Sequence, residues 1–220
     1  MTGSDGLGEL LPPSGGYRNL KTFRLARLVY DITVRFCDLY VPLSSRTHDQ
    51  MVQAARSGVQ NIAEGSAASV TSQKMEMKLT GVAWASLGEL ELDYEDVLRH
   101  WGLPQWEGDH SILCRFKATR CADLPAFRAW IASELRHPDS TSVRPCESVQ
   151  VRALPCPPGV RGRQDRPDAY AANGALSLLN LVRPWLVRQL GAQGNAFLEK
   201  GGFTERLYKA RSGARRHQWA

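Results

Sequence analysis

The sequence predicts an all-α protein, an antiparallel four-helix bundle with an inserted helical and Pro-rich region and a short basic C-terminal suffix. Two observations carry this prediction. Apolar residues recur at the three-and-four spacing of a helix face in four long segments, about residues 18–40, 47–65, 72–100 and 168–200. Segments that contain Gly, Pro or Ser separate them. The 220 residues, 43% of them hydrophobic, suffice for one main core.

The N-terminal part predicts a leader and a first helix. Residues 1–16 are rich in Gly, Pro and Ser and show little periodicity, so we expect a flexible leader. The first bundle helix should cover about residues 18–40 and end before Pro42, because proline does not continue a helix. Its apolar stripe comprises Leu25, Leu28, Val29, Ile32, Phe36 and Leu39.

The second helix has its own start and stop signals. Thr47 followed three residues later by Gln50 is a capping-box pattern, which predicts a helix that begins at Thr47. Gly65 is a natural stop signal. The apolar face between them comprises Val52, Ala55, Val59, Ile62 and Ala63.

The third helix is expected over about residues 72–100, with Thr71 or Ser72 as its cap. Residues 17–106 would then hold the first three helices of the bundle. The buried face of the third helix should comprise Met75, Leu79, Val82, Ala83, Leu87, Leu90, Tyr94 and Val97.

This third helix also has a second apolar face, on which small residues are bordered by large ones. A glycine inside a helix costs about 1 kcal/mol relative to alanine, so two of them indicate that another backbone comes close. The covering element is either a part of the same chain, the insertion or the C-terminal helix, or a second subunit. We favour a homo-oligomer interface made of Met77, Gly81, Trp84, Ala85, Gly88 and Leu92.

Residues 107–167 form the expected insertion. Two helical stretches, residues 109–121 and 123–136, come first, and Asp123 is a start signal because proline follows in the first turn. Residues 137–167 are rich in Pro and Arg, which predicts a linker or long loop. The fourth bundle helix should cover residues 168–200, with a kink at Pro184. Residues 201–220 form the basic suffix, in which Thr204 can cap a short helix.

The composition limits the location of the protein. No run of eighteen apolar residues is present, and the first residues lack the pattern of a signal peptide. We therefore expect a soluble, cytoplasmic protein with no membrane partner. The five cysteines are an odd number without Cys-x-x-Cys spacing, so neither a disulfide framework nor a zinc ribbon is indicated.

Positive charge is clustered along the chain, within a net charge of +6. Residues 18–36 and residues 201–220 each carry five basic residues and one acidic residue. Such clusters fit phosphate groups of a nucleic acid, although a solvated helix face is the alternative. The candidate nucleic-acid-binding residues are Arg18, Lys21, Arg24, Arg27, Arg56, Arg206, Lys209, Arg211, Arg215 and Arg216.

Motifs of catalysis are missing from the sequence. It holds no phosphate-binding glycine loop, no dinucleotide fingerprint, no His-Glu-x-x-His pair and no nucleophile motif. His110 and Cys114 have helical i,i+4 spacing, but structural zinc needs four well-placed ligands. We expect no enzyme activity, no metal and no cofactor.

Several segments resemble a known family. The matching residues are 53–65, which end in Asn61-Ile62-Ala63-Glu64-Gly65, followed by residues 83–94, with further similarity in residues 16–23 and 201–207. They resemble the four-helix-bundle proteins encoded in intervening sequences of 23S ribosomal RNA genes and the accessory variability determinants of diversity-generating retroelements, in a suffix-bearing variant. The resemblance implies ring-like homo-oligomers, typically pentamers, and a reverse transcriptase or its template RNA as a partner. Residues 106–168 do not match.

The sequence thus predicts a non-enzymatic, homo-oligomeric, nucleic-acid-binding accessory protein whose lysines and arginines contact phosphates rather than bases. The alternative is a protein-protein interaction scaffold whose basic face docks an acidic partner. RNA or DNA affinity that falls steeply with salt would distinguish the first from the second.

Overall fold

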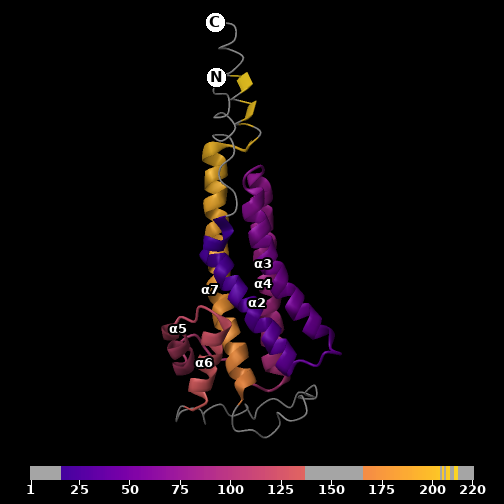
Figure 1. Ribbon diagram of the computed structural model, residues 1–220, viewed down its shortest axis with the longest axis vertical. Coiled ribbons are helices and arrows are strands. Elements are labelled where there is room, and N and C mark those ends of the chain that lie inside the picture. The colour runs from indigo at the N-terminus through magenta and orange to yellow at the C-terminus, as the bar shows by residue number, and fades with distance from the viewer. Residues whose placement is uncertain (1–15, 137–165, 204, 206, 209–210, 213–220) are drawn as a thin grey trace.

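Figure 1 shows the computed structural model of the chain, which describes residues 16–136, 166–203, 205, 207, 208, 211 and 212. Six α-helices and one short 3-10 helix make up its regular structure, and the described residues contain no strand. The prediction of an all-α protein is confirmed for this part of the chain. The elements are η1 (Gly16–Asn19), α2 (Lys21–Tyr40), α3 (Arg46–Ala68), α4 (Gln73–His100), α5 (Ser111–Thr119), α6 (Leu124–Glu134) and α7 (Pro167–Lys200).

The four long helices pack side by side. Helix α3 contacts α4 and α2, and α7 contacts α4 and α2, so each long helix has two long neighbours. Helices α5 and α6 lie together beside one half of α7 (Figure 1). One continuous hydrophobic core runs through all of them. No helix among the described residues is long and apolar enough to cross a membrane.

The core also contains polar groups that are satisfied locally. The buried Tyr94 hydroxyl donates a hydrogen bond to Thr33 Oγ1 at 3.1 Å, and Thr33 Oγ1 donates to the carbonyl oxygen of Val29 at 2.8 Å. Burial raises the pKa of the Cys37 thiol to about 12 and also raises that of Tyr94. Both side chains therefore remain uncharged at neutral pH.

Helix α3 differs from its predicted limits at both ends. Ser45 is the N-cap, and its Oγ accepts a hydrogen bond from the Thr47 amide at 3.2 Å, so the predicted start at Thr47 is wrong by one residue. The predicted stop at Gly65 is also wrong, because the helix continues to Ala68. A Cβ atom at Gly65 would lie 3.3 Å from the Glu76 carbonyl oxygen and 3.3 Å from Leu79 Cβ. This glycine allows close approach of α4 and does not end the helix.

Helix α4 begins as predicted, since Ser72 is its N-cap and accepts a hydrogen bond from the Met75 amide at 3.2 Å. Ala83, Leu87, Leu90, Tyr94 and Val97 are buried as predicted. Met75 and Val82 are not, since their residues are 45% and 40% exposed. At about 100° per residue they lie some 80–100° from Ala83, at the margin of the buried arc.

Helices α5 and α6 are anchored by aromatic rings. Asp123 caps α6 as predicted, because its Oδ1 accepts a hydrogen bond from the Ala126 amide at 2.8 Å. Phe116 of α5 lies 4.4 Å from Trp130 and 5.6 Å from Phe127 between ring centroids. Both α6 rings press against Gly174 of α7, where a Cβ atom would lie 2.7 Å from Phe127 and 3.0 Å from Trp130.

Substitution by alanine should therefore have opposite effects on stability at two glycines of α7. We expect Gly174→Ala to lower the free energy of unfolding by about 1–3 kcal/mol, because two buried rings would have to move. Gly191→Ala is the matched control, since among the described residues no atom outside the adjoining turns of α7 lies within 4 Å of its Cβ position. It should raise stability by about 0.5–1 kcal/mol through helix propensity. Urea unfolding measures both values, and equal effects would contradict the close packing at Gly174.

Candidate nucleic-acid interface

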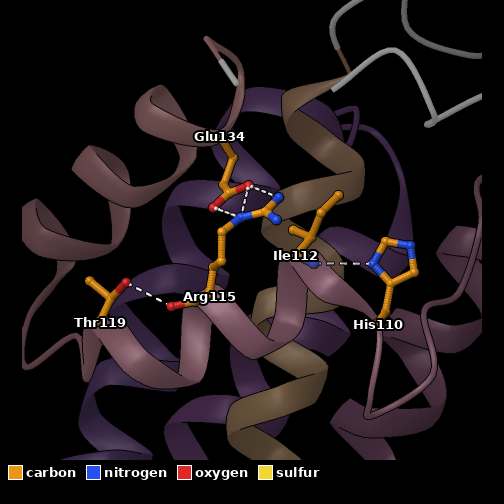
Figure 2. Close-up of polar contacts among 5 residues, drawn as sticks. All are labelled: His110, Ile112, Arg115, Thr119 and Glu134. Atoms are coloured by element: carbon orange, nitrogen blue, oxygen red, sulfur yellow. Dashed lines mark hydrogen bonds and ion pairs between the residues drawn. The ribbon is translucent and has the colours of Figure 1, made fainter. Parts of the chain in front are cut away.

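An ion pair fixes α5 to α6, as Figure 2 shows. Arg115 Nε donates hydrogen bonds to both carboxylate oxygens of Glu134, at 2.9 and 3.0 Å, and its Nη2 donates to Oε2 at 2.6 Å. Glu134 is only 5% exposed. At the ends of α5, Thr119 Oγ1 donates to the Arg115 carbonyl oxygen, and the Ile112 amide donates to His110 Nδ1 (Figure 2). The last turn of α5 therefore has a fixed position.

The segment before α5 is tied to α7 by one asparagine. Asn173 Oδ1 accepts a hydrogen bond from the Trp106 amide at 2.8 Å, and its Nδ2 donates to the carbonyl oxygens of Pro104 and Ala169, both at 2.9 Å. The Trp106 ring stacks on His110 at 5.1 Å with an interplanar angle of 7°. Trp106 thus has a defined orientation.

These contacts leave two hollows beside α7. The large hollow, of about 740 Å³, has a mainly apolar and aromatic lining that includes Leu25, Trp106, Leu113, Phe116, Leu176, Leu181 and Trp185, with the amides of Gln105, Asn173 and Asn180. The small hollow, of about 180 Å³, lies at the start of α2. Leu25, Cys121 and Trp185 line both, so the hollows adjoin.

The rim of these hollows is positively charged. Lys21 and Arg24 of α2 line the small hollow, and Lys117 and Arg120 line the large one. We call these four residues the basic seam. Among the described residues, no Asp or Glu lines either hollow. Four cations at hollows that no described carboxylate lines favour a positive potential that attracts anions. One negative charge does act at the junction of the hollows, where burial and the charge of Asp123 raise the pKa of the Cys121 thiol.

Arg120 has an unusual backbone conformation. It is the C-cap of α5 and adopts φ 49° and ψ 50°, in the left-handed region that favours glycine. The turn brings its side chain to the large hollow, next to Cys121.

The basic seam contains only two of the sequence-predicted phosphate contacts, Lys21 and Arg24. Arg18 is exposed on η1, with its guanidinium 5.8 Å from the Tyr17 ring centroid. Arg27 pairs with Asp31 at 3.5 Å, which offsets part of its charge. Arg56 is exposed on α3 and lines neither hollow.

The predicted suffix contacts are largely outside the described residues. Arg211 is described and exposed, whereas Arg206, Lys209, Arg215 and Arg216 are not described. The sequence analysis missed Lys117 and Arg120, because it could not place the insertion against α2. The available signal was the position of these two cations at the end of an apolar helical pattern.

A further hollow, between α3 and α4, has the opposite character. Its volume is about 750 Å³, and Asp49, Glu89 and Asp93 are among its lining residues, with one cation, Arg46. Burial raises the pKa of Asp93, and the charges of Asp96 and Glu89 raise it further. A phosphate backbone would be repelled here and attracted to the basic seam.

The face predicted as an oligomer interface is partly covered within the chain. Arg183 of α7 lies against Gly88, 3.0 Å from the Cβ position there, and its guanidinium is 4.9 Å from the Trp84 ring centroid. Arg183 also pairs with Glu91. In the described part of the chain the remainder of the face is open, since outside the adjoining turns of α4 no atom lies within 4 Å of the Gly81 Cβ position, and Leu92 is 63% exposed. Ala85 is exposed, and Met77 is half-buried.

Metal ligands do not converge in the described part of the chain, where no group of three or more His, Cys, Asp or Glu side chains could hold an ion. His110 and Cys114, the strongest pair in the sequence, are engaged locally. His110 stacks on Trp106, and Cys114 Sγ lies 3.4 Å from the Asp109 carbonyl oxygen.

Comparisons of the chain with protein-family models, with curated proteins and with solved structures found no match. The class that the structure itself defines is an all-helical protein with a positively charged seam beside an aromatic hollow.

The ion pair between α5 and α6 gives a direct test of how the seam is positioned. We expect Glu134→Ala to lower the free energy of unfolding by about 1–3 kcal/mol, because Arg115 would be left partly buried without its carboxylate. The double variant Arg115→Met, Glu134→Leu should recover part of this loss. Urea unfolding measures both. A Glu134→Ala variant as stable as the unmodified protein would show that the pair does not hold α5 and α6 together.

Proposed function

We propose that this protein is a non-enzymatic accessory protein that binds single-stranded nucleic acid along the basic seam. One observation carries the proposal: Lys21, Arg24, Lys117 and Arg120 line adjoining hollows whose lining also includes the half-buried Trp106 and Trp185 and no described carboxylate. The cations would bind the phosphates of the strand, and the aromatic side chains would stack on its bases.

A single strand fits this chemistry better than a duplex does. Proteins that bind single strands combine a positively charged groove with aromatic side chains on which bases stack. In a duplex the flat faces of the bases are stacked on one another, so its outer surface offers mainly phosphates. The aromatic lining of the large hollow would then have no partner.

A third hollow on α2 also has cations in its lining. It has a volume of about 190 Å³ between α2 and α6 and is lined by Arg35 and Arg128, and no described Asp or Glu lines it. The stretch of α2 between it and the basic seam contains the Arg27–Asp31 pair. A strand long enough to pass this pair would meet two further arginines, which a single small anion could not reach.

The architecture and assembly belong to the same proposal. The packing of α2, α3, α4 and α7, each against two of the others, supports an antiparallel four-helix bundle with α5 and α6 as its insertion. The family resemblance in residues 53–65 supports a homo-oligomer, a pentamer in that family, with a reverse transcriptase or its template RNA as partner. A cytoplasmic location, expected from the composition, belongs to the same proposal. The suffix, residues 201–220, would add phosphate contacts.

Charge removal tests the binding site. We expect the double variant Lys21→Gln, Arg24→Gln to weaken binding of a fluorescent single-stranded oligonucleotide roughly tenfold, or about 0.7 kcal/mol for each charge. The slope of log affinity against log salt should become shallower by about 1.4, because each single-strand phosphate contact contributes about 0.7. Fluorescence anisotropy across a salt series measures both quantities.

The matched control is Lys74→Gln, Lys78→Gln, which removes two exposed charges from α4. We expect its affinity to change less than about twofold. Equal losses in the two double variants would mean diffuse attraction and would contradict a site at the basic seam. No binding by the unmodified protein at low salt would instead favour the protein-scaffold alternative.

The oligomer has its own test at Gly81. We expect the unmodified protein to sediment as an oligomer and Gly81→Leu to sediment as a smaller species, because the new side chain would block close backbone approach. The melting temperature of the Gly81→Leu monomer should not fall, since no other described element of the same chain occupies the space around the Gly81 Cβ position. Gly88 is a poorer position, because a side chain there would displace Arg183. A monomeric unmodified protein would contradict the interface.

A further inference from the structure

The large hollow differs from a surface that only attracts phosphates. Its volume of about 740 Å³ lies within the range of small-ligand pockets, about 300–1,000 Å³. Four parts of the chain form it: Leu25 of α2, helix α5 with the residues just after it, the middle of α7, and the segment around Trp106. Arg115 fixes α5 and Asn173 fixes the segment around Trp106 to α7, so the hollow is largely formed before a ligand binds.

The lining of the large hollow suits a flat ring with polar edges. Trp185 contributes an indole ring to the lining, Trp106 lines the hollow while stacked on His110, and Leu176 and Leu181 add apolar surface. Asn180 adds an amide, which carries both a hydrogen-bond donor and an acceptor. An acyl chain would leave this amide and the cations without partners, whereas a nucleobase has an aromatic face and a polar edge.

Trp185 lies at the junction of the two hollows, because it lines both. Lys21 and Arg24 are on one side of it, and Lys117 and Arg120 line the other hollow. A strand whose phosphates follow the four cations would therefore carry a base past Trp185, at the entrance of the large hollow.

Resting on the proposed function, we infer that the large hollow seats one unstacked nucleobase of the bound single strand, with Trp185 as its stacking surface. The seam cations hold the phosphates on either side of this base. The site is tolerant of base identity, because stacking uses the π-face that every base has.

The test compares two fluorescent oligonucleotides of equal length, an eight-residue thymidine strand and the same strand with every base replaced by an abasic residue. We expect the unmodified protein to bind the thymidine strand about tenfold more tightly. Trp185→Leu should lower affinity for the thymidine strand by a similar factor and leave both the abasic strand and the salt slope unchanged. Trp185→Phe, which keeps an aromatic face, should retain most of the affinity.

Because Trp185 is partly buried, Trp185→Leu could also disturb folding, so a second variant tests the same site without changing Trp185. Asn180 is exposed and lines the large hollow, so Asn180→Trp should fill the hollow without disturbing the core. This variant should lower the affinity for the thymidine strand and leave the affinity for the abasic strand unchanged. Its far-ultraviolet circular dichroism should match that of the unmodified protein.

The outcomes separate the two proposals. Salt-dependent binding that is equal for the thymidine and abasic strands would overturn the base site and leave the proposed function standing. Thymidine-strand affinity that is unchanged in both Trp185→Leu and Asn180→Trp would also overturn the base site. No binding of either strand at low salt would overturn the proposed function and the base site with it.

Discussion

The close packing at Gly174 is the constraint on which the candidate interface depends. The rings of Phe127 and Trp130 come within 2.7 and 3.0 Å of the position that a Cβ atom would take, so α6 packs nearly against the backbone of α7. Phe116 then joins the same cluster, and the Arg115–Glu134 pair ties α5 to α6. These contacts together position α5 beside α7. Without them the large hollow, with Lys117 and Arg120, would not adjoin the small hollow of Lys21 and Arg24.

Helix α7 connects the separate parts of the molecule through different faces. Leu179, Val182 and Leu186 are fully buried in the core, whereas Arg183 reaches across α4 to Trp84 and Glu91. A largely buried ion pair adds little net stability, because desolvation offsets the attraction between the charges. The pair does raise the free energy of other registers of α7 against α4, because in those registers one of the two charges would be buried without the other. The Arg183 contact therefore helps to define how α7 lies against α4.

The sequence was informative where structure is local. Helical periodicity predicted the all-α class, and side-chain caps predicted the starts of α4 at Ser72 and α6 at Asp123, since these signals lie within one turn. The failures have non-local causes. Gly65 resembles a stop signal, but its role depends on Glu76 and Leu79 of another helix. The seam likewise joins residues nearly one hundred positions apart, which no periodicity in the sequence can indicate.

At position 120, where the backbone is left-handed, helix stability and anion binding favour different residues. A non-glycine residue in this conformation costs about 1 kcal/mol, and glycine or asparagine would relieve that strain at the end of α5. Either replacement would also remove one of the four cations beside the large hollow. The most stable sequence at this position is thus not the one with the strongest attraction for an anion. If selection acts on binding here, it must tolerate a less stable helix end. Such a trade-off between stability and binding is expected at a functional site and not at a turn with a structural role alone.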